Sequence, residues 1–199
     1  MWSESLKILP TSGAPIPAWF DIQTFDVAAA LTLSEDEEGI KASSAAIHKI
    51  IEDEINSGII SSRIVVGGFS QGAAMSIYST LTNKNDMGGL LAISGYFPQR
   101  NSFPGAAAEI NKDVQALQVH GTADTVAPYN PVAILSNTLM NEFMTNLEFK
   151  YYQGLGHTMI DEEISYIKEF LDRILATNQW YIQCDLCLII QISFLFIST

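Results

Sequence analysis

The chain has 199 residues, of which 48% are hydrophobic and 16% are charged, so it can build a folded core and does not have the composition of a disordered chain. Its length suits a single domain. Its 10 basic and 22 acidic residues give a formal net charge of −12. This charge excludes nucleic acid as a partner, because nucleic-acid binding needs a basic face, and it disfavours binding to an anionic membrane surface.

The two cysteines, Cys184 and Cys187, both lie close to the C-terminus. No disulfide framework can hold the domain together, which is typical of a reducing compartment such as the cytoplasm. The pair has the C-x-x-C spacing of some zinc and redox sites, but no second pair and no histidine lies nearby, so we interpret it as two incidental thiols. The N-terminus lacks a charged segment followed by an apolar stretch, and no signal peptide is expected.

The first predicted helix covers about residues 35–57, after a proline-rich, loop-like entry over residues 1–33. Ser34 and Glu37 have the spacing of a capping box, and Gly58 is a stop signal. The acidic run at residues 35–38 is interpreted as a solvated helix start rather than a metal site. One apolar stripe recurs at helical spacing, with Ser44 filling a gap: Ile40, Ile47, Ile51 and Ile55.

Beyond residue 58, short apolar runs alternate with helical patterns. Strands are predicted at residues 63–69, 89–93, 116–119 and 147–152, and helices at 71–81, 131–144 and 161–175. This alternation predicts an α/β fold with a mostly parallel sheet and helices on both faces. No internal repeat or interdomain linker interrupts the pattern, so residues 1–176 are expected to form one domain.

Residues 177–199 form an atypical hydrophobic tail with a single charge, Asp185. Its apolar run, residues 186–197, is interrupted by Gln191 and Ser193 and is shorter than the roughly twenty residues that a membrane span needs. We therefore predict no stable membrane span. The tail is either an extra segment packed on the domain or a translated, non-native sequence, and it would be prone to aggregation if exposed.

The strongest chemical signal is the G-x-S-x-G motif of residues 68–72, which lies between a predicted strand and a predicted helix. This is the context of a nucleophile elbow, a tight turn whose serine projects at the carboxyl end of the strand. Ser70 would be the nucleophile. The backbone N–H of Gln71, at the helix start, can donate to an oxyanion.

A serine nucleophile needs a general base, usually histidine, that a carboxylate orients. Ser70, Asp124 and His157 follow one another in the order nucleophile, acid, base, and each follows a predicted strand, so the three are expected at one edge of the sheet. Of the other histidines, His120 is interpreted as a structural residue buried beside the turn. His48 is interpreted as a surface residue of the first helix.

With these motifs, the sequence resembles the acyl-protein thioesterase and lysophospholipase family of small cytosolic α/β-hydrolases. The resemblance spans about residues 15–175 and is carried by the strings W-F-D-I at 19–22, G-G-F-S-Q-G at 67–72, H-G-T-A-D at 120–124 and G-L-G-H at 154–157. It implies an α/β-hydrolase fold, a Ser70–Asp124–His157 triad with Gln71 as one oxyanion donor, and no metal or organic cofactor. It also implies a cytoplasmic enzyme whose substrates are S-acylated proteins, lysophospholipids or small carboxylic esters.

The sequence departs from this family at its N-terminus. Members of the family begin with strands and a His-Gly-x-Gly-Asp-type loop that supplies the second oxyanion N–H, and nothing like this loop precedes Trp19. Residues 7–10 are interpreted as a possible remnant of a preceding strand. We therefore expect an N-terminally truncated fold with half of the oxyanion hole missing and a sheet edge exposed.

Two functional hypotheses follow from these observations, besides the interpretation that both atypical ends mark an unstable fragment with no function of its own. The first is a serine hydrolase that cleaves acyl thioesters or esters through an acyl-serine intermediate. The alternative is a catalytically impaired family member that binds acyl chains or lipidated proteins without turnover. The missing loop motivates this alternative, and the sequence does not indicate an oligomeric state.

Overall fold

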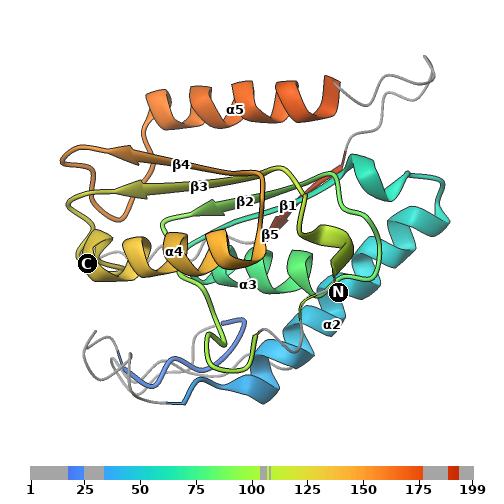
Figure 1. The fold of residues 1–199 in the computed structure, drawn as a ribbon, viewed down its shortest axis with the longest axis horizontal. Coiled ribbons are helices and arrows are strands. Elements are labelled where there is room, and N and C mark those ends of the chain that lie inside the picture. Colours follow the sequence, from blue (N-terminus) through green and yellow to red (C-terminus); the bar gives the residue numbers. More distant parts are fainter. Residues whose placement is uncertain (1–17, 25–33, 104–106, 108, 177–187, 193–199) are drawn as a thin grey trace.

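A computed structural model describes residues 18–24, 34–103, 107, 109–176 and 188–192 of the chain. Its centre is a parallel sheet with the strand order β4-β3-β2-β1-β5 (Figure 1). The strands are β1 (Ile64–Phe69), β2 (Gly89–Ile93), β3 (Ala116–Gly121), β4 (Leu147–Tyr152) and β5 (Leu188–Ile192). Every pair of neighbouring strands is parallel, as the alternation of strands and helices predicted.

Helices cover both faces of this sheet, which confirms the predicted α/β architecture. They are α2 (Glu37–Asn56), α3 (Gln71–Leu81), α4 (Ile134–Phe143) and α5 (Asp161–Ala176), with short turns at Ser61–Arg63 and Glu109–Asn111. Figure 1 shows α5 on one face and α2, α3 and α4 on the other. The expected helix at 131–144 is divided into a π-helical turn, Tyr129–Ala133, followed by α4.

The core has two layers because successive side chains of a strand point to opposite faces. On β1, Ile64 and Val66 belong to the larger cluster, which includes side chains from α2, α3 and α4. Val65 and Phe69 face the other way and pack in the cluster that includes apolar side chains of α5. Every residue of β1 is buried, so the strand before the predicted nucleophile is rigidly enclosed.

The start of α2 differs from the sequence prediction. The N-cap is Asp36 rather than Ser34, and its carboxylate accepts the Gly39 N–H at 3.0 Å and the Asp21 N–H at 2.9 Å. Glu35 is not solvated as expected, because it accepts the backbone N–H of Gln99 at 2.6 Å. Asp36 is favoured as the N-cap because its carboxylate bonds both to the first turn of the helix and to the backbone at Asp21.

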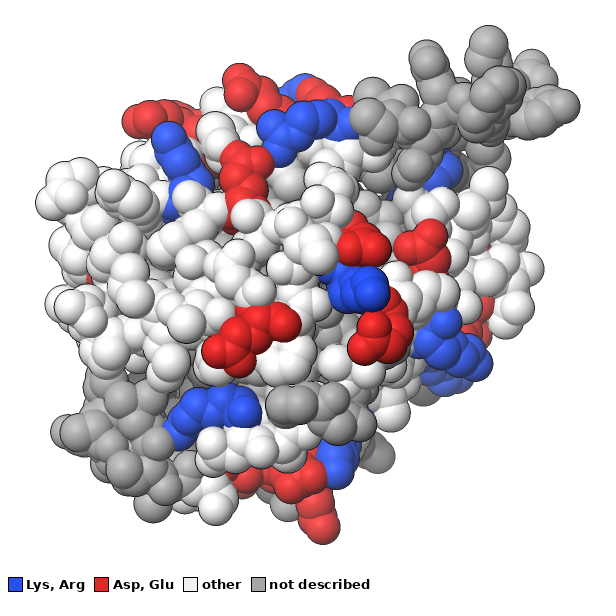
Figure 2. All heavy atoms as spheres, in the orientation of Figure 1, with Lys and Arg blue, Asp and Glu red and all other residues white. Residues whose placement is uncertain are grey.

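The acidic composition appears at the surface as a mixture of charges. Figure 2 shows Lys and Arg side chains lying beside Asp and Glu on the face that it draws. Exposed pairs such as Lys84–Glu52 at 2.6 Å and Lys49–Asp53 at 2.8 Å neutralise individual cations. Isolated exposed pairs of this kind contribute little to stability.

The C-terminal tail contributes a strand to the sheet. β5 pairs with β1 in parallel, with Ile190 opposite Val66, so β5 rather than β1 is the edge strand at this end of the described sheet. Cys184, Cys187 and the expected strand remnant at residues 7–10 lie outside the described residues. Among the helices that the structure describes, none is long and apolar enough to cross a membrane.

Removing β5 is expected to destabilise the domain. A chain ending at Ala176 would leave the backbone N–H and C=O groups on one edge of β1 unpaired, and its free energy of unfolding should fall by more than about 2 kcal/mol. Urea denaturation measures this loss. A chain ending at Ile192 retains β5 and is the matched control, and equal stability of the two truncated chains would contradict this role for the strand.

Candidate active site

Ser70 lies in a strained turn between β1 and α3. Its backbone dihedral angles are φ 56° and ψ −118°, and its N–H donates to the Ile93 carbonyl at 2.8 Å. The turn is so tight that a Cβ atom on Gly68 would come within 2.4 Å of the Gly72 backbone. Only glycine fits at position 68, which explains why small residues flank the serine. This geometry is that of a nucleophile elbow.

A chain of two hydrogen bonds runs from Ser70 through His157 to Asp124. His157 Nε2 lies 2.9 Å from Ser70 Oγ, and His157 Nδ1 lies 2.7 Å from Asp124 Oδ2. A carboxylate only accepts hydrogen bonds, so Nδ1 carries the proton and Nε2 is free to accept from the hydroxyl. The structure thus brings together the three residues that the sequence reasoning selected.

Three elements position these side chains at one edge of the sheet. Ser70 follows β1, Asp124 follows β3 and His157 follows β4, and parallel strands place their carboxyl ends together. The His157 ring packs against Phe69 with 4.7 Å between ring centres. The His157 side chain is 13% exposed and that of Asp124 is fully buried, so of these two residues only His157 reaches solvent.

Asp124 is held by its own loop. Its Oδ1 accepts the N–H groups of Val126 and Ala127 at 2.9 and 2.8 Å. Burial alone would raise the pKa of this carboxyl, but hydrogen bonds from His120, His157 and the Ala127 N–H outweigh burial and hold the pKa well below its usual range. Asp124 is therefore ionised throughout the neutral range and favours a positive charge on His157.

The other two histidines take different positions. His120 is buried, as expected, and its Nε2 bonds to the Ala127 carbonyl at 2.7 Å and lies 3.4 Å from Asp124 Oδ2. The expectation that His48 is a surface residue is not met. It is half-buried between α2 and α3, and its Nε2 lies 2.8 Å from the Ser79 carbonyl.

Gln71 has a structural role that the sequence reasoning missed. Its buried amide accepts the Trp19 N–H at 2.8 Å and donates to the Phe20 carbonyl at 2.8 Å. These two bonds fasten the segment at residues 18–24 beside the nucleophile elbow. Sequence spacing does not reveal a contact across about fifty positions. The Gln71 backbone N–H, at the first position of α3, precedes the helical hydrogen bonds and so stays available for an oxyanion.

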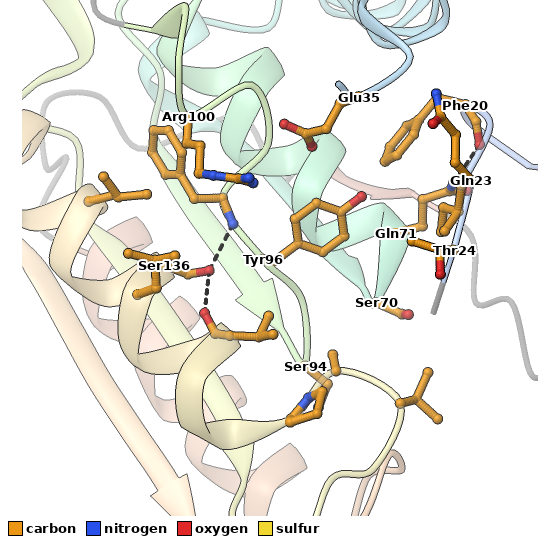
Figure 3. A pocket seen from close by; sticks show the side chains of 18 of the residues that line it. Phe20, Gln23, Thr24, Glu35, Ser70, Gln71, Ser94, Tyr96, Arg100 and Ser136 are labelled. Atoms are coloured by element: carbon orange, nitrogen blue, oxygen red, sulfur yellow. Dashed lines mark hydrogen bonds between the residues drawn. The ribbon is translucent and has the colours of Figure 1, made fainter. Parts of the chain in front are cut away.

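A cavity of about 150 Å³ adjoins Ser70. Figure 3 shows Ser70 and Gln71 at its side, with Phe20 and Tyr96 projecting across it. Its lining is mostly apolar and comes from the 18–24 segment, from the loop after β2, from the loop after Asp124 and from α4. The apolar side chains are Phe20, Ile22, Tyr96, Phe97, Val126, Ala127, Pro128, Val132, Leu135 and Leu139.

One part of the cavity is polar. Glu35 and Arg100 both line it, and Figure 3 shows their side chains on the same side of the cavity as Tyr96. Burial raises the pKa of Glu35, and this effect is partly offset by the Gln99 N–H and by the charge of Arg100. The cavity is therefore a mostly apolar space whose lining includes three charged residues, Asp21, Glu35 and Arg100.

Glu163 is a second buried carboxyl close to this region, at the start of α5. Its side chain is fully buried, and burial raises its pKa to about 7, a shift partly offset by the Ile160 N–H and by His120. Sequence reasoning did not select Glu163, because three acidic residues in a first helical turn are an ordinary pattern. Within the described part of the chain, no cluster of three or more potential ligands could hold a metal ion.

Comparison with known proteins assigns the chain to a family. Residues 4–175 match the family model described as phospholipase/carboxylesterase. The chain belongs to this family. The acyl-protein thioesterase 1 of Neurospora crassa is 39% identical over 170 residues, which cover 84% of this chain and 69% of that protein. The counterpart in Schizosaccharomyces pombe is 30% identical over 177 residues, covering 87% and 75% of the two chains.

Solved structures agree with this assignment and with the α/β-hydrolase fold. Arabidopsis thaliana SOBER1 has a TM-score of 0.78 and 28% identity, covering 86% of this chain and 80% of that chain. Acyl-protein thioesterase 2 of Zea mays has a TM-score of 0.65 and 26% identity, covering 81% and 74%. Membership of the phospholipase/carboxylesterase family supports the conclusion that the chain is a hydrolase. The expectation that the family's oxyanion loop is missing before Trp19 concerns residues 1–17, which lie outside the described residues.

The two hydrogen bonds by which the Gln71 side chain holds residues 18–24, here called the Gln71 clamp, can be tested by substitution. Gln71→Ala leaves the Trp19 N–H and the Phe20 carbonyl without partners, and it should lower the free energy of unfolding by about 1–3 kcal/mol. Urea denaturation gives the value. Gln23→Ala is the matched control, because Gln23 lines the same cavity but is exposed. A loss of similar size in both variants would argue against the clamp.

The raised pKa of Glu163 predicts a pH-dependent stability. The folded value of about 7 lies above the ordinary value of 4.5, so the folded state retains a proton that the unfolded state releases. The stabilising contribution is complete below about pH 4.5 and is lost as the pH rises through 7. Glu163→Gln cannot ionise. The difference in free energy of unfolding between this variant and the wild type should therefore favour the variant by about 1–3 kcal/mol more at pH 8 than at pH 4.5.

Urea denaturation at the two pH values measures this difference. Glu162→Gln, which removes the neighbouring exposed carboxyl, is the matched control and should show no such dependence. If Glu163→Gln follows the wild-type pH dependence, the buried carboxyl does not titrate as stated.

Proposed function

We propose that this chain is a serine hydrolase that cleaves acyl thioesters or esters through a covalent acyl-Ser70 intermediate. The observation that carries the proposal is the unbroken hydrogen-bonded chain from Ser70 through His157 to Asp124. Ser70, the first residue of this chain, lines a mostly apolar cavity. Such a chain activates a hydroxyl that is otherwise a weak nucleophile at neutral pH.

In the first half of the reaction, Ser70 Oγ attacks the acyl carbonyl while its proton passes to His157 Nε2. The developing imidazolium is stabilised by the buried, ionised carboxylate of Asp124. The Gln71 N–H donates to the negative oxygen that forms on the carbonyl. The bond from the acyl carbon to sulfur or oxygen then breaks, and the leaving group takes the proton from His157.

In the second half, a water molecule enters beside His157, which is partly exposed. His157 removes a proton from this water as it attacks the acyl carbon. The bond between the acyl carbon and Ser70 Oγ breaks, and His157 returns the proton to the serine. The products are a carboxylic acid and the original enzyme, so the mechanism requires no metal or organic cofactor.

The cavity and the relatives together suggest the substrate class. An apolar lining beside the nucleophile suits a fatty acyl chain, because burial of each methylene group is favourable by about 0.8 kcal/mol. Relatives are named acyl-protein thioesterase, which supports S-acylated proteins as substrates, with lysophospholipids and small esters as further candidates. We propose that the enzyme acts on them in the cytoplasm.

Labelling with a fluorophosphonate probe tests the triad. The probe phosphonylates a serine only where a base and an oxyanion site activate it, so the wild type should label and Ser70→Ala should not. His157→Ala and Asp124→Asn should slow labelling by on the order of a thousandfold or more, because the base is lost or misoriented. Hydrolysis of p-nitrophenyl butyrate provides the turnover measurement alongside it.

The controls separate catalysis from folding. All variants should retain the wild-type circular dichroism spectrum, and Ser136→Ala provides a cavity-lining serine away from the triad that should leave Ser70 labelling in place. Labelling that survives Ser70→Ala would reject the assignment. A folded wild type that neither labels nor turns over, but binds a fluorescent fatty acid, would favour the non-catalytic acyl-binding alternative.

A further inference from the structure

The loop that follows β2 contains two strained residues beside the cavity. Ser94 and Gln99 have positive φ angles of 49° and 53°, and among the described residues other than glycine the one further positive φ is that of Ser70. Side chains other than glycine rarely adopt this conformation, and it persists only where the surrounding structure enforces it. Four residues of the loop line the cavity: Ser94, Tyr96, Phe97 and Arg100. The shape of the cavity therefore depends on what holds this loop.

Neighbouring elements hold the loop along its length. The Ser94 N–H donates to a carbonyl of β3 at 2.8 Å, and the Phe97 N–H donates to Ser136 Oγ on α4 at 2.8 Å. The Gln99 N–H donates to Glu35 Oε2 at 2.6 Å. Glu35 lies two residues before the start of α2, so this third hydrogen bond joins the strained end of the loop to a different part of the fold.

Glu35 is a costly acceptor for such a bond. A backbone N–H needs only an oxygen atom, which an amide or a hydroxyl side chain also supplies. Glu35 instead places a carboxyl group in the wall of a mostly apolar cavity. Its other oxygen, Oε1, is buried and has no hydrogen-bond partner within the described part of the chain. Burying an unpaired polar atom is unfavourable, so anchoring the loop does not by itself account for a carboxyl group here.

Glu35 and Arg100 lie at the end of the cavity that is away from the nucleophile. In Figure 3, the ring of Tyr96 lies between Ser70 and these two side chains. We call Glu35 and Arg100 the polar end of the cavity. Glu35 also fixes the place of Arg100, because the residue that it binds, Gln99, directly precedes Arg100 in the chain. An acyl chain bound to Ser70 thus meets apolar side chains before it reaches the polar end.

We propose that Glu35 is a specificity-determining residue that limits the length of the acyl chain which this enzyme prefers. This inference rests on the hydrolase function proposed above. Each methylene group that packs on the apolar lining improves binding about fourfold. A methylene group that reaches the polar end gains no such improvement, because it would cover Glu35 and Arg100 and remove their charges from water. The preferred substrates are therefore acyl groups that end before Glu35.

The first experiment is the chain-length profile of kcat/KM for p-nitrophenyl esters from acetate to dodecanoate. In the wild type, kcat/KM should rise with each methylene group and then level off. Glu35→Ala removes the carboxyl group and releases Gln99, so the profile should level off at a longer chain. The ratio of kcat/KM for dodecanoate to that for butyrate should rise about tenfold, the gain from one or two further buried methylene groups. The increase should come from a lower KM for dodecanoate, and kcat/KM for acetate should stay within about twofold.

Two further variants separate this role from folding and from net charge. Glu35→Gln retains an oxygen that accepts the Gln99 N–H and keeps a polar group at the same place, so it should retain the wild-type profile. Glu38→Ala removes an exposed carboxyl from the first turn of α2 and should also leave the profile unchanged. An unchanged profile in Glu35→Ala would overturn the proposal, as would an effect of equal size at every chain length. A Glu35→Gln variant that behaves like Glu35→Ala would also overturn it.

The second experiment does not depend on catalysis. In a Ser70→Ala background, isothermal titration calorimetry with octanoate and dodecanoate measures binding of the acyl chain alone. Adding Glu35→Ala should raise the affinity for dodecanoate relative to that for octanoate by about tenfold. This result in a chain that does not hydrolyse esters would support the role of Glu35 and reject the proposed hydrolase. Ser70-dependent hydrolysis without any effect of Glu35→Ala on either ratio would reject the role of Glu35 alone.

Discussion

The site depends on the way β1 is held. This strand is buried on both faces and has a parallel neighbour on each edge, β2 on one side and β5 on the other. A strand enclosed in this way cannot relax, so the strain of the turn at Ser70, with its positive φ, is maintained by the surrounding core. The nucleophile therefore lies at the carboxyl edge of the sheet, from which the loops that carry Asp124 and His157 also extend.

The order of the elements and the main candidate residues could be predicted from the sequence. β2 and β4 begin and end where the apolar runs do, and α3 begins within the G-x-S-x-G motif, at Gln71. Local pattern suffices in these places because each run is short and bounded by turn residues. The grouping of Ser70, Asp124 and His157 was also predictable, since all three follow parallel strands and parallel strands share one carboxyl edge.

What the sequence did not reveal are contacts across long separations. Asp36 caps α2 in place of Ser34 because its carboxylate also binds the Asp21 N–H, a tertiary contact that no local rule contains. Gln71 was selected for its backbone, whereas its side chain fastens residues 18–24. β5 has no local signal of its partner either, because an apolar run in a tail fits a packed strand and an unstructured segment equally well.

The two buried carboxyls near the site also differ because of tertiary contacts that the sequence does not show. Asp124 and Glu163 are both removed from water, and burial alone would raise the pKa of each. Asp124 has hydrogen bonds from two histidines and two backbone N–H groups, so it keeps its charge. Glu163 has no comparable set of hydrogen-bond donors, so burial prevails and raises its pKa to about 7. Below about pH 7 the two acids therefore differ in charge: Asp124 is ionised, whereas Glu163 is mostly protonated.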